Sequence, residues 1–307
     1  MSNIIIGIHG LANKPKPEVL SGWWEESIRE GLRNREVDAA DFTFVMVHWA
    51  KFLYKNLQHE DPDFDFDPLF VDQPYKPATP GTLEKYDEWI GDRFRAWGTD
   101  IGGSIMDKVR GPLGLSGIED RLLESKVRDL HYYYNKDKHL RDGNEMLRPA
   151  RQVLMGELTD AIKPFKDDRL MLIAHSMGTI IAYDVLRDLG QDFPDFNVEQ
   201  FVTIGSPLGL SAVKARIYSE RRYADLPVRT PSVVKERWVN YADPADPVAA
   251  ETHLRGDYGP NATGVRVVDD LVHNDYTAPD GERKPHKSFG YLRTPELSDQ
   301  IKDFLQG

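Results

Sequence analysis

Residues 170–186 read LMLIAHSMGTIIAYDVL, and this stretch decides the architecture of the chain. Residues 170–174 are a continuous apolar run, which predicts a strand buried on both faces, and a helical pattern follows from residue 177. Ser176 stands at the junction, with Ala174 two positions before it and Gly178 two positions after it. Small residues at this spacing fit a sharp strand-to-helix turn that exposes a nucleophilic serine. Serine is also a common N-cap residue, so the pentapeptide alone leaves both interpretations open.

The alternation of strands and helices extends along most of the chain. Apolar runs predict strands at residues 4–8, 42–49, 170–174, 201–204, 238–241 and 265–268. Helical patterns occupy residues 17–33, 145–165 and 177–189, and Thr294 and Pro295 open a terminal helix as N-cap and first-turn residue. We therefore expect an α/β fold with a mostly parallel central sheet and helices on both faces.

Residues 51–140 interrupt this alternation. They hold the acidic stretch DPDFDFDP at 61–68, and further on a run of apolar side chains at steps of three and four: Tyr86, Trp89, Ile90, Phe94, Trp97 and Ile101. Such spacing gives a helix one apolar face, which either packs on the main core or roofs an active site. We predict a single domain over 1–307, with 51–140 inserted in it as a cap or lid.

The composition argues against several classes of protein. The formal charge of −11 and the lack of a basic cluster argue against nucleic acid as a partner. The absence of cysteine excludes disulfides and thiolate metal sites. No apolar run approaches the roughly 18 residues that span a bilayer, so we expect a cytoplasmic protein without stable membrane insertion. Residues 61–68 lack the glycine of a calcium loop, and we expect neither metal nor cofactor.

A second chemical element follows the first predicted strand. Residues 8–12 read IHGLA, and Gly10 would let this loop approach a substrate closely. Acyl transfer requires two N–H donors that point at the developing oxyanion. The N–H of Met177, directly after Ser176, and the N–H of Leu11 are the candidates, with Ala12 as the alternative to Leu11. His9 is expected to brace the loop.

The combination of a strand followed by His-Gly and a strand followed by AHSMG and a helix resembles the α/β-hydrolase superfamily, in particular its lipase- and esterase-like serine hydrolases. Two features depart from the family pattern. Ala174 stands where glycine is commoner, and the loop after Gly10 is not glycine-rich. The resemblance implies a catalytic triad in the order serine, acid, histidine, with the acid after a late strand and the histidine before the last helix.

The downstream sequence offers candidates for both remaining positions. Asp246, in ADPADPV after the predicted strand 238–241, is the expected acid, and Asp243 is the alternative. His286, shortly before the terminal helix, is the expected base. His273 is its alternative, and His253 is expected to be structural and to lie on a helix.

These assignments predict a serine hydrolase that cleaves a carboxylic ester through Ser176, His286 and Asp246 and an acyl-enzyme. The substrate is expected to be a small-molecule or lipid-like ester, with a lipase-like apolar pocket supplied by the insertion. The same triad also serves thioesterases and acyltransferases. A hydrolase-fold binding or signalling protein with little or no turnover is the alternative from another class.

Overall fold

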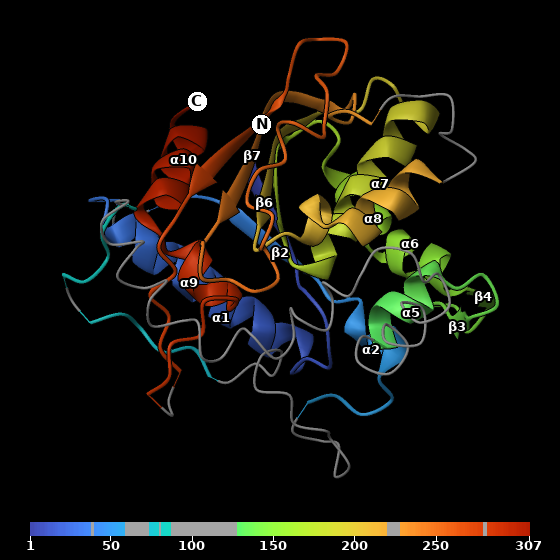
Figure 1. Ribbon diagram of the computed structural model, residues 1–307, viewed down its shortest axis with the longest axis horizontal. Coiled ribbons are helices and arrows are strands. Elements are labelled where there is room, and N and C mark those ends of the chain that lie inside the picture. The colour runs from blue at the N-terminus through green and yellow to red at the C-terminus, as the bar shows by residue number, and fades with distance from the viewer. Residues whose placement is uncertain (38–39, 59–73, 80, 87–127, 220–227, 279–280) are drawn as a thin grey trace.

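The computed structural model describes residues 1–37, 40–58, 74–79, 81–86, 128–219, 228–278 and 281–307. Its centre is a six-stranded sheet in the order β2-β1-β5-β6-β7-β8, in which every neighbouring pair is parallel (Figure 1). The strands are β1 (Asn3–Ile8), β2 (Thr43–Val47), β5 (Arg169–His175), β6 (Val198–Ile204), β7 (Val234–Ala242) and β8 (Val267–Leu271). The predicted α/β class with a mostly parallel sheet is confirmed.

Helices cover both faces of this sheet, as Figure 1 shows. One face carries α6 (Ala150–Ile162), α7 (Met177–Asp192) and α8 (Ser211–Tyr218), and the other carries α1 (Pro17–Arg33), α9 (Ser288–Leu292) and α10 (Pro295–Gln306). The strands divide their side chains between the two cores by strict alternation: Leu170 and Leu172 join the first core, and Met171 and Ile173 the second. A strand buried on both faces has to be apolar at every position, which explains the continuous run in the sequence.

The predicted helix over 145–165 begins later than expected. Residues up to Pro149 form a hairpin of β3 (His139–Arg141) and β4 (Leu147–Pro149), and α6 starts at Ala150. Asp142 Oδ1 accepts the N–H groups of Asn144 and Met146 at 2.9 and 3.0 Å, which closes the turn of this hairpin. Proline disfavours helical geometry in the residue before it, so the helix cannot extend back through Pro149. A short 3₁₀ helix, η1 (Lys163–Phe165), follows α6.

Within the described part of the predicted insertion 51–140, helices are found at α2 (Ala50–Leu53) and α5 (Arg128–Tyr134). Tyr133 of α5 belongs to the main core, and its hydroxyl donates to Asp184 Oδ2 of α7 at 2.6 Å. The acidic stretch 61–68 and most of the aromatic stretch 86–101 lie outside the described residues. Within the described ranges, no helix is both long enough and apolar enough to cross a membrane.

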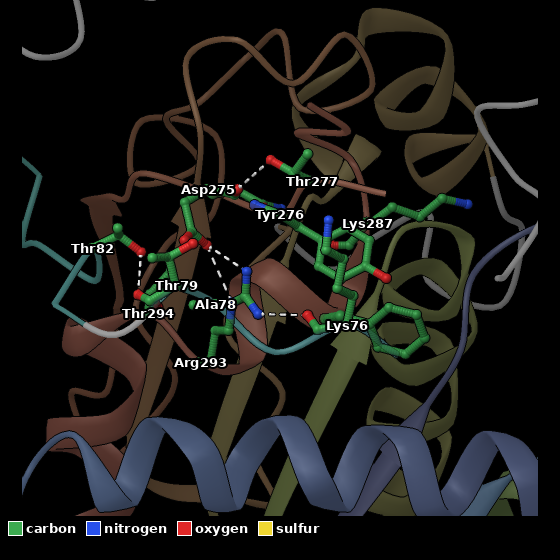
Figure 2. Close-up of polar contacts among 12 residues, drawn as sticks. Lys76, Ala78, Thr79, Thr82, Asp275, Tyr276, Thr277, Lys287, Arg293 and Thr294 are labelled. Carbon is green, nitrogen blue, oxygen red and sulfur yellow. Dashed lines mark hydrogen bonds and ion pairs between the residues drawn. The ribbon is translucent and has the colours of Figure 1, made fainter. Parts of the chain in front are cut away.

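A buried arginine ties segment 74–79 to the C-terminal part of the chain (Figure 2). Arg293, directly after α9, is 2% exposed. Its Nη2 lies 2.9 Å from Asp275 Oδ1, and its Nη1 donates to the carbonyl of Lys76 at 2.9 Å and lies 3.4 Å from Glu30 Oε2 of α1. A charge this deeply buried is tolerated because carboxylates and a carbonyl surround it. The contacts fix the end of α9, the helix that follows His286 in the chain.

Candidate active site

Ser176 occupies a strained turn between β5 and α7. Its backbone has φ +53° and ψ −128°, a conformation that residues with a Cβ rarely adopt and that costs on the order of 1–3 kcal/mol. Ser176 stands at the N-cap position, yet its side chain makes no capping hydrogen bond. The hydroxyl Oγ lies instead 3.0 Å from His286 Nε2. The helix-capping interpretation of the side chain is therefore wrong for this serine.

The small residues around Ser176 are required by the close approach of two backbones. A Cβ on Gly178 would lie 2.6 Å from the carbonyl oxygen of His9, because the first turn of α7 packs against the end of β1. A Cβ on Gly10 would lie 2.6 Å from the Cβ of Ser176. Carbon atoms do not approach that closely, so both positions exclude larger residues. The loop at 8–12 and the turn at Ser176 therefore pack directly against each other.

The structure brings Ser176, His286 and Asp246 together. His286 Nδ1 lies 2.9 Å from both carboxylate oxygens of Asp246, and the three side chains are buried, with residue exposures of 1–2%. A carboxylate only accepts hydrogen bonds, so Nδ1 carries the proton and Nε2 presents its lone pair to the serine hydroxyl. The three are separated by 110 and 40 residues in the chain. Their assignment as catalytic residues stays a prediction.

Asp246 is held by further donors that the sequence analysis missed. The hydroxyl of Tyr291 donates to Asp246 Oδ2 at 2.7 Å, and the N–H of Val248 donates to Oδ1 at 2.8 Å. Gly205, with φ +54°, lies so close that a Cβ there would be 2.9 Å from Asp246 Oδ2 and 3.3 Å from His286 Nδ1. No local pattern signals Tyr291, which lies 45 residues from the acid.

The alternative acid and the alternative base form a separate pair. Asp243 Oδ2 lies 2.6 Å from Arg283 Nη2 and accepts the N–H of Asn274 at 2.6 Å. His273 Nδ1 lies 3.2 Å from the same guanidinium nitrogen and 3.9 Å from Asp243 Oδ2. Burial raises the pKa of Asp243 to about 6 in spite of Arg283. Burial, and then Arg283, lower the pKa of His273 to about 4. No described contact joins this pair to Ser176.

His253 was expected on a helix, and that prediction is wrong. It lies in an irregular, exposed segment, where Nδ1 is 2.8 Å from the hydroxyl of Thr252. The Asp and Pro residues after β7 form a turn, and the chain then continues without helical hydrogen bonds to Leu254. Thr294 does precede α10 as its N-cap residue, but its side chain accepts no capping hydrogen bond from the first turn of the helix, and its hydroxyl donates to the carbonyl of Tyr291 at 2.9 Å.

The N–H groups predicted to bind the oxyanion belong to Met177 at the start of α7 and to the loop that follows β1. Met177 is the first residue of α7, and N–H groups of a first helical turn have no acceptor within the helix. The N–H of Ala12 donates to Asp129 Oδ2 at 2.6 Å, so Ala12 is occupied as a donor. Asp129 is 2% exposed and also accepts the hydroxyl of Tyr54 at 2.6 Å. Leu11 therefore stays the predicted donor on this loop.

His9 contacts the loop in the way that a bracing residue would. Its Nδ1 donates to the carbonyl of Gly10 at 2.8 Å, and its ring stacks on Trp49 with a centroid distance of 4.6 Å. Burial, and then the neighbouring His48, lower the pKa of His9 well below its usual value. A neutral imidazole can donate at Nδ1 and accept at Nε2, which lies 3.4 Å from the N–H of Ala50.

Comparisons with known proteins leave the interpretation to this geometry. No protein-family model matches the sequence, and no curated protein matches it. Among solved structures, the chain is similar to a metagenomic carboxyl esterase, with 13% sequence identity and a TM-score of 0.29. The match covers 50% of this chain and 61% of the esterase chain, which is less than two thirds of that protein. A likeness of this size carries no argument about the site.

Proposed function

We propose that the protein is a serine hydrolase of the α/β-hydrolase type that cleaves a carboxylic ester. The observation that carries the proposal is the chain of contacts from Asp246 to His286 Nδ1 at 2.9 Å and from His286 Nε2 to Ser176 Oγ at 3.0 Å. The strained backbone at Ser176 supports it, because such strain persists where a site requires it. The proposal includes an inserted cap over 51–140 in a single domain.

The first half of the reaction forms an acyl-enzyme. His286 Nε2 takes the proton of the Ser176 hydroxyl while Oγ bonds to the ester carbonyl carbon. Asp246 stabilises the resulting imidazolium through the Nδ1–H bond. The N–H groups of Met177 and Leu11 donate to the oxyanion of the tetrahedral intermediate. The intermediate collapses when the C–O bond to the alcohol breaks and the leaving oxygen takes the proton from His286.

The second half restores the enzyme. Water gives a proton to His286 Nε2 and bonds to the acyl carbon, and a second tetrahedral intermediate forms. Its collapse breaks the bond to Ser176 Oγ, which recovers its proton, and the carboxylic acid leaves. The cycle consumes one water and needs no redox partner. His286 Nε2 exchanges its proton in turn with Ser176 Oγ, the leaving oxygen and water, while the contact of Nδ1 with Asp246 is kept throughout the cycle.

Labelling with a fluorophosphonate, followed by peptide mapping, tests the proposal. We expect a covalent label on Ser176 that is lost in Ser176→Ala and in His286→Ala, since the base activates the nucleophile. Ser206→Ala is the matched control: Ser206 is a buried serine whose hydroxyl lies 2.9 Å from Thr179 Oγ1 and accepts the N–H of Leu208. Its removal should leave the label in place. Folded protein that takes no label, beside an esterase that does, would support a binding protein instead.

The acyl specificity is tested with a panel of matched substrates. Esters of rising acyl chain length should show rising kcat/KM if the site includes the apolar pocket that we propose for a lipase-like enzyme, because each buried methylene contributes about 0.8 kcal/mol. Equal activity across the series would exclude such a pocket. Thioesters and amides of the same acyl group then separate an esterase from a thioesterase or an amidase.

A further inference from the structure

Three consecutive backbone carbonyls around His286 all accept hydrogen bonds from buried side chains. Asn274 Nδ2 donates to the carbonyl of Pro285 at 2.7 Å and to that of Lys287 at 2.8 Å. His175 Nε2 donates to the carbonyl of His286 itself at 2.8 Å. About two-thirds of the hydrogen bonds in proteins join backbone groups to each other, so three consecutive carbonyls held by side chains are an unusual arrangement. Asn274 and His175 therefore fix the backbone of residues 285–287, at whose centre the proposed base lies.

His175 links this loop directly to the nucleophile. It is the residue before Ser176, and its ring centroid lies 4.7 Å from that of His286. Because a carbonyl only accepts, the proton of His175 lies on Nε2. Burial, and then the charge of His286, lower the pKa of His175 well below its usual value. The ring thus stays neutral beside His286, and it adds no repulsion when His286 becomes an imidazolium.

Asn274 is fixed so that both of its amide protons point at the loop. Its side chain is fully buried, and its Oδ1 accepts the N–H of Tyr276 at 3.1 Å, which orients the amide. A Cβ on Gly290 of α9 would lie 1.6 Å from the same oxygen, so only glycine leaves room for it. The N–H of Asn274 donates to Asp243 Oδ2 at 2.6 Å. Asp243, the alternative acid, therefore fixes the backbone of Asn274, the residue whose side chain holds the loop of His286.

We propose that His175 and Asn274 are positioning residues for the base of the triad. Asp246 fixes one end of the His286 ring, but the position of Nε2 also depends on where the backbone of residue 286 lies. The three carbonyl bonds determine that position, and thereby the 3.0 Å separation from Ser176 Oγ. A displacement of about 1 Å in such a contact costs on the order of 10²-fold in rate. The inference rests on the proposed function of His286.

The first test compares two variants of one residue. Leucine in His175→Leu has a volume similar to that of histidine and cannot donate, whereas glutamine in His175→Gln carries an amide N–H that can reach the position of Nε2. We expect His175→Leu to lower kcat per titrated active site by about 10- to 100-fold with KM little changed, and His175→Gln to recover to within about threefold of wild type. Equal loss in both variants, or no loss in either, would overturn the proposal.

A matched control separates positioning from a general loss of stability. Tyr183→Phe removes a buried donor to a carbonyl, that of Arg229, at the same distance of 2.8 Å on the far side of α7. It should lower the midpoint of urea unfolding and leave kcat per active site within about twofold. If Tyr183→Phe lowers kcat as much as His175→Leu does, the effect of His175 is ordinary destabilisation and the proposal fails.

A spectroscopic measurement tests the proposal without any turnover. The proton on His286 Nδ1, held by Asp246, should give a low-field ¹H resonance that is assigned by its loss in His286→Ala. We expect this resonance to move or broaden in His175→Leu and in Asn274→Asp, and to keep its position in His175→Gln and Tyr183→Phe. An unchanged resonance in His175→Leu would overturn the proposal. Wild-type protein that shows the resonance but hydrolyses no ester would refute the proposed function and leave the positioning intact.

Discussion

Two aspartate–histidine pairs have their aspartates just beyond the C-terminal end of β7, three residues apart. Asp246 contacts His286 at 2.9 Å, and the other ring nitrogen of His286 faces the hydroxyl of Ser176. Asp243 lies 3.9 Å from His273, and Arg283 contacts both partners, at 2.6 and 3.2 Å. The residue types are the same and both aspartates are buried, but the His273 side chain is 13% exposed and that of His286 is 2% exposed. The residue types alone therefore cannot explain a difference in function.

The difference lies in which group compensates the carboxylate charge. Arg283 already neutralises Asp243, and a charge that is paired with a guanidinium does little for a neighbouring imidazolium. The described donors to Asp246, apart from His286, are the neutral hydroxyl of Tyr291 and the neutral N–H groups of Val248 and Ala249. In the proposed mechanism, Asp246 is therefore the carboxylate whose charge is available to stabilise the His286 imidazolium.

Removing each histidine should give the largest contrast between the two pairs. We expect His286→Ala to lower kcat by about 10⁶-fold, as loss of the base does in serine hydrolases. His273→Ala should leave kcat within about threefold, because its ring contacts Arg283 and not the nucleophile. Ester hydrolysis by the two purified variants, normalised to folded protein, checks this. A larger loss in His273→Ala would show that the pairs had been assigned the wrong way round, and comparable losses would contradict the proposed distinction between them.

Replacing the two acids should give a smaller contrast. Asp246→Asn keeps the shape but cannot stabilise an imidazolium, and we expect kcat to fall by about 10⁴-fold. Asp243→Asn removes the buried carboxylate charge that contacts Arg283, so the free energy of unfolding should fall by about 1–3 kcal/mol. Its kcat should fall by less than tenfold. Urea unfolding and steady-state kinetics on both variants measure the two effects, and a larger kinetic loss in Asp243→Asn would make Asp243 the acid.

A third variant tests the neutral donor that distinguishes Asp246. Tyr291→Phe keeps the ring and removes the hydroxyl, which donates to Asp246 Oδ2 at 2.7 Å and accepts the N–H of Asp243 at 3.0 Å. A hydrogen bond to a charged group contributes about 1.5–3 kcal/mol, and we expect kcat to fall by about tenfold. Tyr183→Phe, which also loses one buried hydroxyl, is the control for stability. Unchanged kcat in Tyr291→Phe would mean that the hydroxyl does not orient the acid.

Much of the fold could be predicted because its signals are local. Apolar runs at β1 and β5 and the helical pattern at α7 are set by residues within one element, and their bounds agree with the structure to within a few residues. The hairpin over 139–149 was missed although Asp142, Gly143 and Asn144 are turn residues, because the helical pattern beyond them was extended too far back. The N-cap side chain of Thr294 was predicted to cap and instead bonds backward to Tyr291.

The site was only partly accessible from the sequence. Ser176, Asp246 and His286 were selected because a known chain order of residue types placed them, and the structure brings them within hydrogen-bond distance. No such chain order of residue types points to Tyr291, Asn274 or Gly205. Their importance comes from distances between segments far apart in the chain, and Asn274 reaches the carbonyls of residues 285 and 287 only because β7, β8 and α9 meet there. Contacts between residues so far apart in the chain cannot be predicted from a single sequence.

The smallest expected effect is a pH dependence of the free energy of unfolding, which should have opposite signs for Asp243 and His273. The pKa of His273 falls from its usual 6.5 to about 4 in the folded protein, so the unfolded chain binds the proton first as the pH drops. His273 therefore costs stability progressively between about pH 6.5 and pH 4. The pKa of Asp243 rises from 3.8 to about 6, so the folded protein binds that proton first, and acidification from pH 6 adds stability.

The two variants should therefore respond to acidification in opposite ways. When the pH falls from 7 to 5, the free energy of unfolding of His273→Gln should increase relative to that of the wild type, and that of Asp243→Asn should decrease relative to it. Urea unfolding of all three proteins at both pH values measures this, and differences that stay constant with pH would mean that neither group titrates between the folded and unfolded states as its burial requires.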